Sequence, residues 1–177
     1  MGQSSEAFSD DELALVFEEA DHFGQEAGRA VRVLARTAIH PSDLGSLRPA
    51  NLYLKPWRGA NQLWLGWRRV KNGKECTWPV ASDIEDWILD WLTTPRPQHR
   101  STWNLLLKQV EHELEKRGYS FTVCPRRFRH TAIVRLIQMG VPVPEVCRMA
   151  GVTMRTLETY GSRQPGAVAE AMFQQGW

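Results

Sequence analysis

The stretch CPRRFRHTAIVRLIQMGVPVPEVCRMAGVTMRTLETY, which runs from Cys124 to Tyr160, decides how the rest of the chain is interpreted. It opens with three arginines in four residues and holds two helical patterns separated by a Gly-Val-Pro break. On a helix that begins at its first proline, Arg126, Arg129 and His130 fall at i, i+3 and i+4, on one face that could bind a phosphate or simply be solvated. The opposite side would dock on a core through four apolar residues: Phe128, Ile133, Leu136 and Ile137.

This stretch resembles the C-terminal half of the catalytic domain of tyrosine recombinases, the phage integrase family. In that family a His-x-x-Arg box opens a helix with an Arg-His-Thr run, and a Leu-Gly-His segment precedes the nucleophilic tyrosine. Arg129-His130-Thr131 matches the run, and Gly140-Val141 matches the break that follows the helix. Ala150-Gly151-Val152 matches the Leu-Gly-His segment, and Tyr160 stands in the place of the nucleophile, one residue closer than usual. Arg126 occupies the usual position of the first histidine of the box, and Val152 that of the second histidine.

The segment Thr37-Ala38-Ile39-His40-Pro41-Ser42-Asp43-Leu44 extends the resemblance toward the N-terminus. It is similar to the family's Thr-Gly-Leu-Arg-x-x-Glu-Leu box, which carries the first catalytic arginine, but His40 stands in the arginine's place. An imidazole can contact a phosphate oxygen, although it lacks the bidentate fork of guanidinium and is mostly neutral near pH 7. His40 is therefore either a weak catalytic residue or a residue that only caps or packs. Pro41 suits the first turn of a short helix.

Three strand-like runs follow this box, at 51–54, 62–70 and 75–80, and they predict a small antiparallel sheet. The second and third runs are joined by Lys71-Asn72-Gly73-Lys74. An Asn-Gly pair between strands predicts a tight hairpin turn in which both central residues take positive φ. In the recombinase family a lysine on this hairpin acts as general acid, and the resemblance places Lys71 in that position. The alternative is an ordinary solvated lysine.

The remaining pattern is helical. A capping box at Ser9 predicts the first helix, and a second helix is expected from Gln25 to about Ala38. Ser82 and Ser101 are expected to cap two further helices. The fold class is therefore α+β, mostly helical, similar to a tyrosine recombinase catalytic domain with a three-stranded antiparallel sheet. We expect residues 1–177 to form one such domain, without the separate N-terminal DNA-clamping domain that is usual in the family.

Composition narrows the class of protein. No apolar run reaches the length of a membrane span, and the N-terminus is acidic and unlike a signal peptide, so a cytoplasmic protein is expected. Cys76, Cys124 and Cys147 form no Cys-x-x-Cys pair and are expected to be thiols of a reducing compartment. The five histidines show no metal-ligand spacing. We therefore expect no metal and no cofactor.

The net charge of +2 hides an uneven distribution. Eight acidic residues and no lysine or arginine precede Arg29, so the remainder carries all 22 basic residues and 12 of the 20 acidic ones. A basic excess of this kind favours a polyanion such as nucleic acid as the partner, although moderate basicity is common in other proteins.

The resemblance implies DNA recombination or integration, as in mobile genetic elements, on double-stranded DNA. Tyr160 would attack a DNA phosphate and form a 3′-phosphotyrosyl link, Arg129 and Arg126 would neutralise the phosphate, and Lys71 would protonate the leaving 5′ oxygen. His40 would be the weakest member of the site, and activity could be impaired. The resemblance also implies a homo-oligomer on DNA, in which the tail from Pro165 to Trp177 packs on a neighbouring protomer.

A second interpretation involves no bond breakage. Residues 143–161 also resemble a helix-turn-helix, with an Ala-Gly-Val-Thr turn before a recognition helix that begins near Thr153. Arg155 and Tyr160 would then contact DNA directly. A degenerate integrase that binds DNA without cleaving it lies between the two interpretations.

Overall fold

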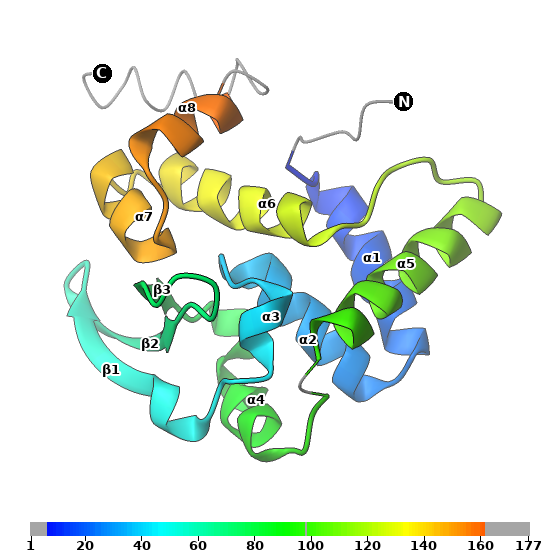
Figure 1. The fold of residues 1–177 in the computed structure, drawn as a ribbon, viewed down its shortest axis with the longest axis horizontal. Helices are drawn as coiled ribbons and strands as arrows, with labels where there is room; N and C mark the ends of the chain where they lie inside the picture. Colours follow the sequence, from blue (N-terminus) through cyan, green and yellow to red (C-terminus); the bar gives the residue numbers. More distant parts are fainter. Residues whose placement is uncertain (1–6, 98, 162–177) are drawn as a thin grey trace.

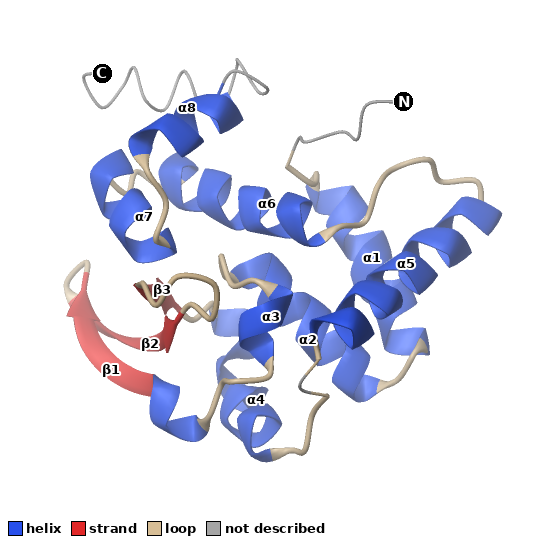
Figure 2. Cartoon of the chain, in the orientation of Figure 1, coloured by secondary structure: helices blue, strands red, loops and turns tan. Residues whose placement is uncertain are grey.

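The computed structural model describes residues 7–97 and 99–161, and for residues 158–161 it describes the backbone alone. The predicted class is confirmed: the chain is mostly helical with one three-stranded antiparallel sheet (Figures 1 and 2). The elements in chain order are α1 (Asp10–His22), α2 (Gln25–Arg36), α3 (Pro41–Leu44), the 3-10 turn η1 (Pro49–Asn51), β1 (Leu52–Trp57), β2 (Ala60–Arg68), β3 (Glu75–Pro79), α4 (Ser82–Thr93), α5 (Arg100–Lys116), α6 (Pro125–Gln138), α7 (Val143–Ala150) and α8 (Met154–Gly161).

Helix α6 begins at Pro125 as predicted, but its two-faced character was predicted wrongly. Every residue from Arg127 to Ile137 except Arg135 is buried, so the helix is covered on nearly its whole circumference. Figure 1 shows why: α6 passes over α2 and lies between α7 at one end and α1 at the other. Of the three residues expected on a polar face, Arg129 and His130 are buried and Arg126 is exposed. A helix enclosed in this way serves as a core element, not as a surface strip.

The N-terminal segment is fastened to α6 by polar contacts. The predicted capping box at Ser9 is present, since its Oγ accepts the amide of Glu12 at 3.1 Å and its amide donates to the Glu12 carboxylate at 2.9 Å. The same carboxylate forms an ion pair with Arg127 at 2.6 Å. The amide of Phe8 donates to the Thr131 hydroxyl at 2.9 Å. These contacts hold the start of α1 against the first turns of α6.

Acidic residues of the N-terminal segment pair with arginines from later parts of the chain. Five such carboxylates lie within ion-pair distance of four arginines: Asp10 of Arg135, Glu12 of Arg127, Glu18 and Glu19 of Arg117, and Asp21 of Arg32. The uneven charge distribution in the sequence is therefore partly cancelled in the folded protein. The basic surface available to a polyanion is smaller than the count of basic residues indicates.

The sheet has the order β1-β2-β3 with both pairs antiparallel, and its strands fall within a few residues of the predicted runs. The tight turn with positive φ at both central residues was predicted between β2 and β3, but it occurs between β1 and β2. Between β1 and β2, Arg58 and Gly59 take φ of 52° and 83°, whereas Asn72 is not among the described residues with positive φ. The Asn72 side chain instead accepts the amide of Lys74 at 3.2 Å, which shapes a longer connection between β2 and β3.

Two predicted helix caps are wrong, and one helix ends early. Helix α4 begins one residue and helix α5 two residues earlier than expected, and neither N-cap residue, Ala81 or His99, makes a side-chain capping bond. Helix α2 ends at Arg36 because Thr37 leaves the helix, donates its hydroxyl to the Val33 carbonyl at 2.7 Å and accepts the amide of Ile39. This early end frees the following segment to approach α6.

The core lies between α6, the sheet and the helices α1, α2, α4 and α5. Trp64 and Trp67 are buried in it, so their rings are not available to stack on DNA bases. Cys76, Cys124 and Cys147 are all free thiols. Within residues 7–97 and 99–161, no helix is both long and apolar enough to cross a membrane.

Candidate active site

His40 sits at the N-terminus of the short helix α3, where it fills the N-cap position. Its Nδ1 accepts the amide of Ser42 at 3.2 Å and lies 2.9 Å from the Ser42 hydroxyl. An Nδ1 that accepts an N–H bond carries no proton, so the proton of the neutral ring is on Nε2. The capping alternative considered for His40 is thus present in the structure. It leaves the Nε2–H available as a donor.

Burial lowers the pKa of His40, and the positive charge of Arg100 lowers that pKa further. The carboxylate of Asp43 acts in the opposite direction, while Arg129 and Arg69 again lower the pKa. The imidazole is therefore neutral at pH 7, because its pKa lies below the ordinary value of 6.5. It can donate one hydrogen bond to a phosphate, but it contributes no positive charge.

Asp43 joins the α3 segment to the β2–β3 hairpin. Its buried carboxylate accepts the amide of Val70 at 2.9 Å, directly before Lys71. Lys71 itself is exposed in the connection between the strands, which is closed by a bond from the amide of Arg69 to the carbonyl of Lys74 at 2.9 Å. The segment that carries His40 and the hairpin that carries Lys71 are therefore held side by side.

Arg129 links two parts of the chain that are distant in sequence. Its guanidinium donates to the carbonyl of Ala38, just before His40, and to the carbonyl of Ala150 at 2.6 Å, at the end of α7. The side chain is 7% exposed. Charge-assisted bonds of this kind are strong, so Arg129 fixes the spacing between the α3 segment and α7.

The end of α7 lies directly against the hairpin at Gly151. This residue has φ of 62°, and a Cβ placed there would be 2.8 Å from the Cys76 Sγ, so only glycine fits without a shift. Arg69 Nη1 donates to the Gly151 carbonyl at 3.5 Å. Successive carbonyls at the negative end of the helix, those of Ala150 and Gly151, thus each contact an arginine.

The other predicted site residues are less tightly placed. Arg126 is exposed in the first turn of α6, and no interaction that the structure records in its described part joins it to Arg129. Val152, in the position of the second histidine, is half-buried and packs on the core. The backbone of Tyr160 belongs to α8, and its side chain lies outside the described part. The tail from Pro165 to Trp177 also lies outside it.

Sequence reasoning overlooked Arg69. This residue directly follows β2, and its guanidinium contacts Gly151, 82 residues away. The charges of Arg69 and Arg129 both lower the pKa of His40 and of Cys76. The signal was present in the sequence, because Arg69 precedes Lys71 by two residues on a predicted hairpin. It was not decisive, since Arg68 stands beside it and alternation alone does not say which arginine faces the site.

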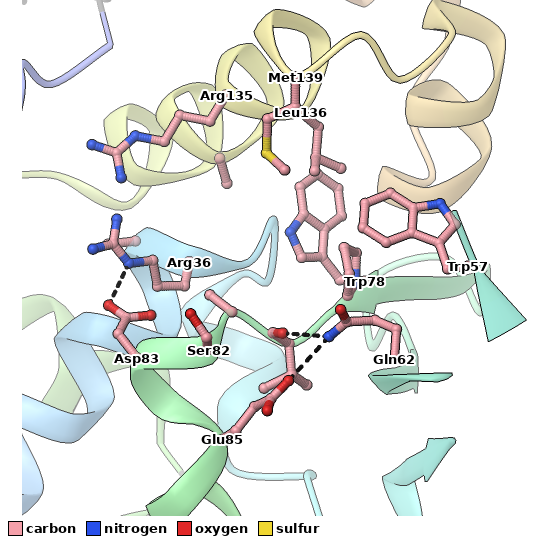
Figure 3. A pocket seen from close by; sticks show the side chains of 15 residues that line it. Arg36, Trp57, Gln62, Trp78, Ser82, Asp83, Glu85, Arg135, Leu136 and Met139 are labelled. Atoms are coloured by element: carbon pink, nitrogen blue, oxygen red, sulfur yellow. Dashed lines mark hydrogen bonds and ion pairs between the residues drawn. The ribbon is translucent and has the colours of Figure 1, made fainter. Parts of the chain in front are cut away.

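A separate pocket of about 540 Å³ lies between the C-terminal half of α6, the end of α2, the start of α4 and the sheet (Figure 3). Its walls include the indole rings of Trp57 and Trp78, and none of the predicted site residues lines it. Four of its polar side chains are paired with one another: Arg36 with Asp83 at 2.8 Å, and Gln62, which donates to Glu85 at 3.2 Å. The pocket is therefore not the candidate active site.

Comparison with solved structures finds this architecture in a recombinase and in the catalytic domain of an integrase. The chain superposes on XerA recombinase with a TM-score of 0.67 and 18% identity, covering 97% of this chain and 65% of that chain. It superposes on the catalytic domain of bacteriophage HP1 integrase with a TM-score of 0.61 and 16% identity, covering 94% and 93%.

The fold is that of a tyrosine recombinase catalytic domain. No protein-family model matches the chain, and no curated protein matches it in sequence. At identities below 20% the comparison establishes the fold, while the chemistry depends on the residues described above. The chain spans just under two thirds of the length of the XerA protein that it resembles.

Proposed function

We propose that this protein breaks and rejoins DNA strands as a site-specific recombinase or integrase that uses a tyrosine nucleophile. The observation that carries the proposal is the convergence of three distant segments on one place: the α3 N-terminus with His40, the β2–β3 hairpin with Lys71, and α6 with Arg129. The segments are joined by hydrogen bonds of Asp43 and Arg129, and they occur in a fold shared with recombinases.

The proposed reaction is a phosphoryl transfer. The Tyr160 oxygen attacks the phosphorus and forms a 3′-phosphotyrosyl bond, while the bond to the 5′ oxygen breaks and Lys71 gives that oxygen a proton. In the reverse step a 5′ hydroxyl attacks and releases the tyrosine. Arg129 and Arg126 are proposed to offset the charge on the non-bridging oxygens, and His40 to donate its Nε2–H.

The proposed partner is double-stranded DNA. Basic residues occupy exposed positions on several elements: Lys71 and Lys74 on the hairpin, Arg100 at the start of α5, Arg126 on α6 and Arg155 on α8. We further propose that the protein assembles on DNA as a homo-oligomer, with the residues beyond α8 contacting a neighbouring protomer. A role in the integration of a mobile element is part of the same proposal.

The test begins with selection of bound sequences from a random duplex library. A supercoiled plasmid that carries the selected site is then incubated with the full chain in the presence of a chelator. The proposal predicts relaxation of the plasmid, together with a covalent protein–DNA species that survives detergent. Binding without relaxation and without that species would contradict it.

A second candidate is a DNA-binding protein that keeps the recombinase fold without strand cleavage. Three observations favour it. Arg129 is engaged with the Ala38 and Ala150 carbonyls, His40 is neutral at pH 7, and Val152 offers no hydrogen-bond donor from its side chain. Helices α7 and α8 would then act as the helix-turn-helix that residues 143–161 resemble. Sequence-selective binding that depends on Arg155, with no covalent species, would support this candidate.

A further inference from the structure

The hairpin arginine Arg69 has a guanidinium that is only loosely engaged. Its Nη1 is 3.5 Å from the Gly151 carbonyl, the upper limit for a hydrogen bond, and its Nε is buried with no hydrogen-bond partner. A buried donor without a partner costs free energy. The guanidinium therefore gains by binding an acceptor, and a phosphate oxygen is the acceptor that suits its planar fork.

The backbone around Arg69 is held in place. Its amide donates to the Lys74 carbonyl, and the next residue, Val70, donates to the buried Asp43 carboxylate. The Gly151 carbonyl, at the negative end of α7, holds the guanidinium on the side of the hairpin that faces α7. A donor oriented by rigid elements loses little freedom when an oxyanion arrives.

The neighbours of Arg69 are the groups already placed in the site. Arg69 and Arg129 donate to the successive carbonyls of Gly151 and Ala150, so the two arginines lie at the same end of α7. Both charges lower the pKa values of His40 and of Cys76. Arg69 also contacts the residue directly before Val152. It therefore lies between the two positions, His40 and Val152, where the residue present cannot supply a guanidinium or an imidazole donor.

We infer that Arg69 contacts the non-bridging oxygens of the scissile phosphate and supplies the guanidinium that position 40 lacks. The inference rests on the proposed function. Arg100 at the start of α5 is a competing arginine, because it is exposed. The charge of Arg100 lowers the pKa of His40 more than the charge of Arg69 does. Arg69 differs from it in contacting the Gly151 carbonyl directly, beside Cys76, whose pKa it also lowers.

The experiment compares Arg69→Ala with Arg100→Ala and with Arg68→Ala on the selected duplex. Arg68 is the matched neighbour: it is exposed and pairs with Glu75 at 3.3 Å. For Arg69→Ala we expect a cleavage rate lower by about 100-fold and a slope of log Kd against log salt reduced by about 1. On a duplex with a single neutral methylphosphonate at the scissile position, wild type and Arg69→Ala should bind with equal affinity. Any affinity that Arg68→Ala loses relative to wild type should be the same on this duplex and on the unmodified one.

A rescue variant excludes a purely structural effect. Arg69→Ala combined with His40→Arg should recover a large part of the lost cleavage, because a guanidinium returns to the same phosphate from the α3 side. Equal affinity and equal salt slope for Arg69→Ala and wild type would overturn the inference and leave the proposed function intact. The inference would also be overturned if Arg100→Ala, and not Arg69→Ala, lost affinity on the unmodified duplex while matching wild type on the methylphosphonate duplex. If the wild type showed no salt-dependent DNA binding, the proposed function itself would fail.

Discussion

Three arginines that are near neighbours in the sequence have three different roles. Arg126 is exposed, Arg127 is buried in an ion pair with Glu12, with its guanidinium 4.1 Å from the centre of the Phe8 ring, and Arg129 is buried against two carbonyls. Successive helix residues point about 100° apart, so each arginine meets a different neighbour. Their substitution should therefore have different consequences for stability and for DNA binding.

Replacement of Arg129 should damage the fold as well as the proposed reaction. Arg129→Ala leaves the buried carbonyls of Ala38 and Ala150 without their donor, so we expect the free energy of unfolding to fall by about 2–5 kcal/mol. Arg129→Lys should lose somewhat less, since one ammonium cannot reproduce both bonds. Urea denaturation followed by circular dichroism measures both, with Arg126→Ala as the exposed control expected within about 0.5 kcal/mol of wild type. Equal stabilities of Arg129→Ala and Arg126→Ala would refute the structural role.

His40 should make stability depend on pH. Its pKa is lowered in the folded protein by burial and by Arg100, so the unfolded chain binds more protons than the folded one once the pH falls toward 6.5. The contribution of His40 is therefore complete above pH 6.5 and is lost as the pH falls below that value. His40→Asn keeps a good N-cap for α3 and removes the titration. Thermal unfolding at pH 7.5 and pH 5.5 should show a smaller pH-dependent change for His40→Asn; an identical change would contradict this account.

At the scale of elements, local signals in the sequence predicted most of the helices and strands. The capping box at Ser9, Pro125 at the start of α6 and the alternating strands each depend on residues within one element, and each was predicted correctly. The environments of Arg127 and Arg129 were not predicted, because their partners lie 115, 91 and 21 residues away. The Asn72–Gly73 turn was predicted wrongly because the Asn72 side chain accepts a backbone amide and lengthens the connection.

The hairpin that carries Lys71 and Arg69 should depend on one carboxylate in α3. Asp43→Ala removes the acceptor for the Val70 amide, and a hydrogen bond to a charged group contributes about 1.5–3 kcal/mol. Amides of residues 69–74 should then exchange with deuterium about 10- to 100-fold faster. Mass spectrometry of the exchanged peptides checks this, with α5 peptides as the internal control. Unchanged exchange in the hairpin peptide would show that other contacts hold it.

At the scale of the whole molecule, charge pairing refines the prediction of a polyanion partner. Five carboxylates of the acidic N-terminal segment pair with arginines of α2 and α6 and with the C-cap of α5. The exposed bases include residues on the hairpin and at the starts of α5, α6 and α8. The composition predicted a basic molecule, but the distribution of its charge required the fold. The fold matches recombinases, and His40 and Val152 stand at two positions of the candidate site.

The attachment of DNA to Tyr160 tests the central claim most directly. A duplex nicked beside the scissile phosphate of the selected site loses a short fragment after cleavage, so the covalent intermediate accumulates. The account predicts a detergent-resistant protein–DNA species that disappears on protease treatment. Peptide mass spectrometry should place the nucleotide on Tyr160, and Tyr160→Phe should bind the duplex without forming the species. Attachment at another residue, or sequence-selective binding with no covalent species from the wild type, would contradict it.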